Sequence, residues 1–162
     1  MVLPDLLALD LDIVFCGTAA GDASARQGAY YAGRGNAFWP TLHQVGLTPR
    51  QLMPREYPEL LTWRMGLTDM VKSVSGNDEV LSKEQFDVDR LRLMVRDYRP
   101  KILAFTSKRA AREFVGRPVG YGRLAQSEGD TALFVLPSPS GAARRHWMPL
   151  HWQALADLRG GR

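Results

Sequence analysis

Residues 17–31, which we call the front loop, have the composition of a ligand-binding segment. The stretch GTAAG at its start has neither the Lys-Ser/Thr pair of a P-loop nor the spacing of a dinucleotide fingerprint. Its glycines let the backbone approach a flat ligand closely, and Tyr30 and Tyr31 could either stack on a planar ring or pack in the core. Residues 18–20 include no acid, base or strong nucleophile. This tip of the front loop therefore suits binding, and the chemistry must come from residues outside the tip.

Two aspartates near glycines could supply acid–base chemistry, because a carboxylate can orient or deprotonate a water molecule. Asp22 lies in the front loop itself, and Asp69 follows Gly66-Leu67-Thr68. Each also has a simpler interpretation. Asp22 could be a capping or solvated turn residue, and Asp69 could be a surface turn acid or an ion-pair partner of Lys72.

A second unusual segment, the proline loop (residues 137–146), reads PSPSGAARRH. Small, rigid residues followed by two arginines suit insertion beside a sugar-phosphate backbone. The alternative is a proline turn followed by a solvated helix start. The segment alone leaves both open.

The elements that must position these residues follow an alternating pattern. Continuous apolar runs at residues 12–16, 102–106 and 131–136 predict buried strands. Helices are expected near residues 37–45, 86–98, 107–116 and 148–158, and residues 65–71 are interpreted as a loop with a short extended piece. We expect the capping box at residues 82–85 to open the second of these helices. The pattern predicts a mostly parallel sheet covered on both faces, with ligands bound outside the carboxyl ends of its strands.

Bulk properties narrow the class of protein. The 162 residues fit one domain, residues 1–162, and no apolar run approaches the roughly 20 residues that span a bilayer. Cys16 is the only cysteine, which excludes an internal disulfide and a multi-cysteine zinc site and suits a reducing cytoplasm. The N-terminus lacks the basic region of a signal peptide, so we expect a cytoplasmic protein with no membrane partner. A net charge of +4 permits an anionic partner.

Several motifs occur together in a characteristic order. They are G-x-x-x-G from Gly17, G-N-x-F-W from Gly35, Gly66-Leu67-Thr68, and P-S-P-S-G from Pro137. In this order the chain resembles the mismatch-specific uracil-DNA glycosylases, the MUG/thymine-DNA glycosylase family, over nearly its whole length. The resemblance implies an α/β/α sandwich and a monomeric enzyme that needs no metal or cofactor. It also implies that a damaged or mismatched base is turned out of double-stranded DNA into a pocket.

The resemblance implies a role for individual residues. Tyr31 matches the aromatic residue that stacks on the flipped base, and Gly17, Thr18, Ala19 and Ser24 match the rest of the base pocket. The proline loop matches the segment that contacts the DNA backbone and fills the gap in the duplex, through Ser138, Ser140, Gly141, Ala142, Ala143 and Arg144. Asn36 matches an asparagine that we expect to cap the following helix.

The chain departs from the family pattern at two positions. The usual front loop reads G-I-N-P-G, and the asparagine that is expected to position the hydrolytic water is replaced here by Ala19. Ala142 stands where the family commonly has a leucine wedge. Because alanine cannot position water, we expect a relocated carboxylate, with Asp69 as the first candidate and Asp22 as the second. Another branch of the uracil-DNA glycosylase superfamily also has alanine in its front loop, and the chain resembles that branch in having an aspartate at a different position.

The sequence thus predicts a monofunctional DNA glycosylase that excises uracil and leaves an abasic site. G:U mismatches are the expected substrate, with single-stranded uracil and other damaged bases as further substrates. One alternative is a catalytically weak protein of the same fold that binds mispairs or abasic sites. Another is an enzyme that acts on free nucleosides.

Overall fold

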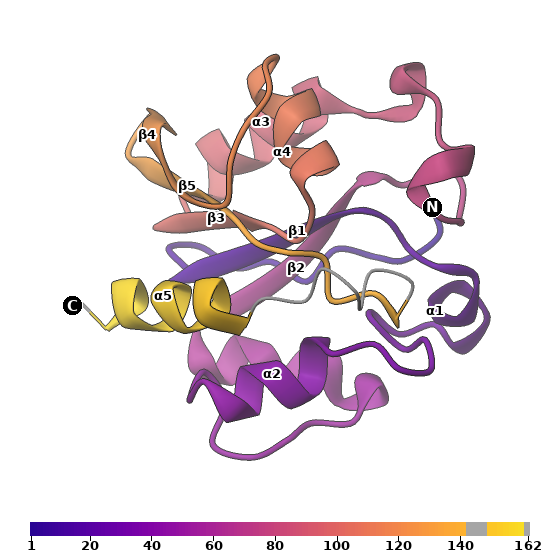
Figure 1. The fold of residues 1–162 in the computed structure, drawn as a ribbon, viewed down its shortest axis with the longest axis vertical. Helices are drawn as coiled ribbons and strands as arrows, with labels where there is room; N and C mark the ends of the chain where they lie inside the picture. The colour runs from indigo at the N-terminus through magenta and orange to yellow at the C-terminus, as the bar shows by residue number, and fades with distance from the viewer. Residues whose placement is uncertain (142–148, 161–162) are drawn as a thin grey trace.

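A five-stranded sheet forms the centre of the computed structural model, which describes residues 1–141 and 149–160 (Figure 1). In spatial order the strands are β2 (Met65–Val71), β1 (Ile13–Ala19), β3 (Ile102–Phe105), β5 (Thr131–Val135) and β4 (Gly122–Glu128). The first four run parallel to one another, and β4 pairs antiparallel with β5 at one edge. The carboxyl ends of the parallel strands therefore meet at one end of the sheet.

Helices cover both faces of the sheet, as Figure 1 shows. One layer contains α2 (Phe38–Gln44), α5 (Pro149–Arg159) and the 3-10 helix η1 (Pro54–Trp63), and the other contains α3 (Val88–Tyr98) and α4 (Lys108–Val115). The side chains of β1 alternate between these layers: Phe15 packs in the core that includes α2 and α5, and Cys16 packs in the core that includes α3 and α4. The predicted three-layer α/β/α sandwich with a mostly parallel sheet is confirmed.

The interpretation of residues 65–71 as a loop is wrong, because this segment is the fully buried strand β2. Its inner edge pairs with β1, and its outer edge is covered by the N-terminal segment. The backbone N–H of Leu6 donates to Leu67 O and the N–H of Leu67 donates to Leu6 O, each at 2.9 Å. Gly66 permits this close approach, because a Cβ there would lie 2.4 Å from the Leu6 carbonyl oxygen. Tertiary cover thus allows a glycine- and polar-containing segment to form a buried strand.

Other boundaries also differ from the predictions. The first strand continues past residue 16 to Ala19, and a short helix α1 (Asp22–Gln27) lies inside the front loop. The Ser82 capping box opens only the 3-10 turn η3 (Lys83–Gln85). Helix α3 instead begins after Asp87, whose side chain accepts from the Arg90 N–H. The sequence pattern also misses β4, whose residues are mostly polar and exposed.

Helix α4 follows its sequence signals closely. Ser107 Oγ accepts from the Ala110 N–H at 3.1 Å, and the helix ends at Gly116, whose φ is 80°. The last helix is α5, although Met148 at its predicted start lies outside the described residues. Within the described part of the chain, no helix is long and apolar enough to cross a membrane.

Candidate active site

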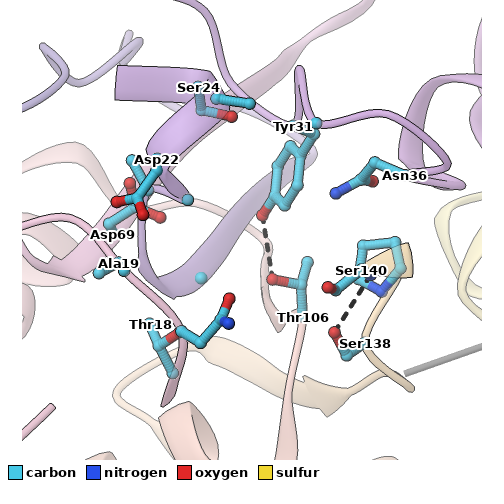
Figure 2. A pocket seen from close by; sticks show the side chains of 18 of the residues that line it. Thr18, Ala19, Asp22, Ser24, Tyr31, Asn36, Asp69, Thr106, Ser138 and Ser140 are labelled. Atoms are coloured by element: carbon cyan, nitrogen blue, oxygen red, sulfur yellow. Dashed lines mark hydrogen bonds between the residues drawn. The ribbon is translucent and has the colours of Figure 1, made fainter. Parts of the chain in front are cut away.

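A cavity of about 590 Å³ opens at the carboxyl ends of the parallel strands (Figure 2). Four parts of the chain that are distant in sequence line much of it: the front loop, the end of β2 with the residues after it, the segment after β3, and the segment after β5. The lining includes most of the residues that the sequence singled out, namely Gly17, Thr18, Ala19, Asp22, Ser24, Tyr31, Asp69, Ser138, Ser140 and Gly141. The topology therefore brings the two candidate carboxylates and the candidate binding residues to one cavity.

Asp69 lies inside this cavity, on β2 and directly opposite Gly17 of β1. Only 4% of its surface is exposed. A Cβ on Gly17 would lie 2.7 Å from Asp69 Oδ1, which is closer than real contacts allow. The glycine thus makes room for the carboxylate. Among the described residues, no group donates a hydrogen bond to this carboxylate, which leaves its oxygens available to a ligand or water.

Burial is the largest cause that raises the pKa of Asp69 to about 6, and the nearby charges act in both directions. Lys72 and Arg90 lower the pKa, whereas Asp5 raises it. These three residues form an ion cluster in which Asp5 pairs with Lys72 Nζ at 2.8 Å and with Arg90 Nη1 at 2.9 Å. The alternative of an exposed Asp69 paired with Lys72 is therefore wrong, because Lys72 pairs with Asp5 and Asp69 is buried.

Asp22 occupies a different environment at the rim of the same cavity. It is exposed in the first turn of α1, and its Oδ1 accepts from Ser75 Oγ at 3.0 Å. This is the environment of a solvated helix-start acid. Asp22 and Asp69 thus share a cavity but differ in burial. The raised pKa of Asp69 is typical of catalytic carboxylates.

Tyr31 forms an aromatic wall of the cavity. Its ring stacks on Phe38 with ring centroids 3.9 Å apart and planes 15° apart. Its hydroxyl oxygen lies 3.0 Å from Thr106 Oγ1, a bond drawn as a dashed line in Figure 2. Burial, with a further contribution from the Asp69 charge, raises the pKa of Tyr31 well above its ordinary value, so the phenol stays neutral. The sequence places Thr106 at the carboxyl end of a predicted strand, where ligands are expected to bind, but assigns it no individual role.

The remaining front-loop residues act through the backbone or hold the loop in place. Ser24 is buried, and its Oγ accepts from the Ala32 N–H at 2.9 Å. Thr18 Oγ1 donates to Asp78 Oδ1 at 2.6 Å, which ties the loop to the segment after β2. Ala19 pairs with Val71 through the backbone and offers only a methyl group. No sequence motif marks Asp78, so this contact could not be anticipated.

The described part of the proline loop packs on the segment before α2. Pro139 O accepts from the Ala37 N–H at 2.8 Å, and Ser138 Oγ accepts from the Ser140 N–H at 3.2 Å. Asn36 Oδ1 accepts from the Phe38 N–H at 3.0 Å, so Asn36 has the capping-type contact that we expected, next to the N-cap residue Ala37. The proposed wedge residues Ala142, Ala143 and Arg144 lie outside the described residues.

The family model of the uracil DNA glycosylase superfamily matches residues 4–159. The chain belongs to this superfamily. The family-level match does not distinguish the mismatch-specific branch from the others. The superfamily consists of DNA glycosylases, hydrolases that act on bases in DNA.

A solved structure has the same fold. The chain is similar to the solution NMR structure of a proposed uracil DNA glycosylase from Methanosarcina acetivorans, with a TM-score of 0.63. The two share 24% sequence identity over 98% of this chain and 95% of the other. At this identity the likeness shows the shared fold.

Two features of the cavity bear on its chemistry. Tyr31 provides a flat aromatic wall, and Asp69 provides a carboxylate that accepts no hydrogen bond from the described residues. Among the described residues, no group of three or more His, Cys, Asp or Glu side chains could hold a metal ion. The buried carboxylate of Asp69 is the group in this cavity whose raised pKa suits acid–base chemistry.

Proposed function

We propose that this protein hydrolyses the N-glycosidic bond of uracil in DNA, with Asp69 as the catalytic carboxylate, and leaves an abasic site. The observation that carries the proposal is the position of Asp69, whose buried carboxylate lies against Gly17 in the cavity walled by Tyr31. We propose double-stranded DNA with G:U mismatches as the principal substrate. A mispaired base costs less pairing energy to extrude than a paired one.

The reaction follows from the chemistry of glycosyl cleavage. The extruded uracil stacks on Tyr31, and the bond breaks with its electron pair passing to the base nitrogen, which leaves an oxocarbenium-like sugar. With a pKa of about 6, Asp69 is mostly ionised at neutral pH, so it can stabilise this cation. It also orients a water molecule whose oxygen bonds to the anomeric carbon, and it accepts the proton that the water loses.

The leaving base carries the negative charge that develops as the bond breaks. Backbone N–H groups of the front loop stabilise this charge on a uracil oxygen, and no side-chain acid is needed. The uracil anion then takes a proton from solvent. In this mechanism Asp69 positions the hydrolytic water. In related enzymes this task is expected of an asparagine, which Ala19 replaces here.

Two features of the cavity support finer proposals. The loop that contains Ala19 reads bases mainly by shape, and such a site rejects a wrong base less strongly than one built on side-chain hydrogen bonds. We therefore propose that single-stranded uracil and other damaged bases are also processed. The described lining residues include no lysine that could form a Schiff base with the sugar, which supports a monofunctional enzyme.

The direct test uses a duplex oligonucleotide with uracil opposite guanine, followed by alkaline cleavage of abasic sites. Asp69→Asn should lower the rate of uracil release about 100-fold or more, because the amide can neither carry charge nor accept a proton. Asp22→Asn, at the rim of the same cavity, should retain most of the activity. If Asp22→Asn abolishes the activity and Asp69→Asn does not, the assignment of Asp69 is wrong.

The absence of a side-chain amide at Ala19 favours a second candidate function. A protein of this fold without sufficient catalytic groups would bind mispairs or abasic sites without releasing a base. This candidate predicts tight binding of an abasic-site duplex together with no uracil release by the wild-type protein. For the glycosylase proposed above, breakage of the DNA strand without alkali would contradict monofunctional action.

A further inference from the structure

Thr106 has no role in the mechanism above, yet it lies at the centre of the cavity. It directly follows β3, is 4% exposed and is tied to Tyr31 hydroxyl to hydroxyl. The only other hydrogen-bond partner of its Oγ1 among the described residues is Cys16 O, at 3.5 Å. Most of its hydrogen-bonding capacity is therefore used to hold Tyr31.

Tyr31 needs such a restraint because its backbone is in an unfavourable conformation. Its φ is 53°, in the left-handed region that side-chain-bearing residues rarely adopt and that occurs preferentially at functional sites. Three contacts hold it: Phe38 supports one face of the ring, Ser24 Oγ accepts from the N–H of the next residue, and Thr106 fixes the hydroxyl. Only the contact with Thr106 restrains the tip of the ring.

The same hydroxyl pair lies next to the carboxylate. The hydroxyl oxygens of Tyr31 and Thr106 are each 3.4 Å from the point where a Cβ of Gly17 would stand, and Asp69 Oδ1 is 2.7 Å from that point. A phenol freed from Thr106 could therefore turn toward Asp69 and donate to it. This would occupy the oxygen that must face water.

We propose that Thr106 is a positioning residue for base excision. Its hydroxyl keeps the phenol of Tyr31 away from Asp69 and holds the ring as a fixed wall for the flipped base. This inference rests on the proposed function, and it extends that function to a hydroxyl pair that acts as one unit.

The test is a double-mutant cycle measured in single turnover on duplex DNA with a G:U mismatch. Thr106→Val and Tyr31→Phe each remove the same hydrogen bond with little change of shape, and Thr106→Ser restores the hydroxyl. Thr131→Val is the matched control. Thr131 is 3% exposed, and its Oγ1 donates to Pro100 O at 2.6 Å, at the opposite end of the sheet from the cavity.

Thr106→Val should slow base release about tenfold, the rate equivalent of one neutral hydrogen bond. Tyr31→Phe loses the same restraint but has no phenol to turn toward Asp69, so it should slow release less. The enzyme concentration that gives half the maximal rate should change little, because the DNA contacts are intact. The double variant should be no slower than the slower single variant. Thr106→Ser should recover most of the rate, and Thr131→Val should lower the melting temperature without slowing release.

The inference is overturned if Thr106→Val releases uracil at the wild-type rate, if the two effects multiply in the double variant, or if Thr131→Val slows release equally. Should Thr106→Val fail to fold, Tyr31→Phe and Thr106→Ser still give the comparison. Wild-type and Asp69→Asn proteins are measured in the same series. A wild-type protein that releases no uracil removes the proposed function and this inference together, whereas an active wild type with an indifferent Thr106 removes only the inference.

Discussion

Gly17 and Asp69 face each other in the cavity, and each residue constrains the other. In the parallel register they stand side by side on β1 and β2, and the missing side chain of Gly17 leaves the space that the carboxylate oxygen fills. A buried carboxylate without a protein hydrogen-bond donor is costly in free energy. Its cost is understandable if water and substrate are its partners during the reaction.

Gly17→Ala should remove most of the activity. The new methyl group would lie 2.7 Å from Asp69 Oδ1, so the carboxylate must move away from its position. Gly21→Ala is the control, because Gly21 lines the same cavity but its added Cβ meets nothing within 4 Å. The measurement is the rate of uracil release by both variants, each assayed at the same interval below its own melting temperature. Equal activities would show that the contact is unimportant.

The activity should depend on pH through Asp69. The ionised form is the active one, and the pKa of Asp69 is about 6, so the single-turnover rate should fall as the pH is lowered through about 6. An ordinary aspartate would lose its charge only near its usual pKa of 3.8. A rate that stays constant from pH 7.5 down to about pH 4.5 would rule out Asp69 as the group that titrates.

The same burial makes Asp69 a cost to stability at neutral pH. Its pKa is higher in the folded protein than the ordinary 3.8, so the folded state holds the proton more tightly. Stability therefore falls as the pH rises from about 3.8 to about 6, and above that range the penalty is on the order of 2–3 kcal/mol. Asp69→Asn should raise the melting temperature at pH 7.5 by about 5 °C or more. This gain should shrink toward pH 4, and thermal unfolding at both pH values tests it.

The contributions of individual residues were only partly predictable. Asp69 and Tyr31 could be singled out because their neighbours in sequence resemble family motifs. Thr106 could be placed at the ligand-binding end of a strand but given no role, and Asp78 could not be singled out. A strand end or a loop position does not reveal which side chain will meet it across the fold. The roles of Asp69, Tyr31 and the proline loop stay predictions until variants are measured.

At the scale of elements, the strands differ in how visible they are in the sequence. The three inner strands β1, β3 and β5 are continuous apolar runs, and all three were predicted. Strand β2 contains Gly66 and Asp69, which have low strand propensity, and its outer edge is covered by the distant N-terminal segment. Strand β4 is a polar edge strand without alternation, so local pattern could not identify it.

The ion cluster around Asp5 joins three elements, and its loss should be felt in both stability and pH dependence. Asp5 accepts from Thr68 of β2 and pairs with Lys72 and with Arg90 of α3. Asp5→Asn should destabilise the protein by about 2 kcal/mol, because it leaves two largely buried cations without a carboxylate. It should also lower the pKa of Asp69, since Asp5 raises it, and so move the acid side of the pH–rate profile downward.

The matched control for this prediction is Asp10→Asn. Asp10 pairs with Arg99 at 3.6 Å, but both side chains are more than half exposed, and such pairs contribute little. Asp10→Asn should leave the stability of the protein and its pH–rate profile nearly unchanged. Similar losses in both variants would mean that the Asp5 cluster has no special role.

At the scale of the whole molecule, binding to DNA should depend on salt. The chain carries a net charge of +4, and Arg34 is an exposed cation at the cavity rim. Raising the salt from about 50 to about 200 mM should weaken binding of a G:U duplex at least about tenfold through release of counterions. Arg34→Gln should make the slope shallower by about one unit. Fluorescence anisotropy measures both, and binding that ignores salt would favour an enzyme of free nucleosides.

The cover over β2 also bears on how this molecule stays separate from its own copies. A fully buried strand at the edge of a sheet is a template for pairing with another chain, and here the backbone of Val2 and Leu6 occupies that edge through bonds to Lys72 and Leu67. If the N-terminal segment detached, the edge of β2, the strand that carries Asp69, would expose unpaired backbone N–H and C=O groups to other chains. Loss of activity and self-aggregation would then begin with one event, so the N-terminal cover protects solubility as well as the site.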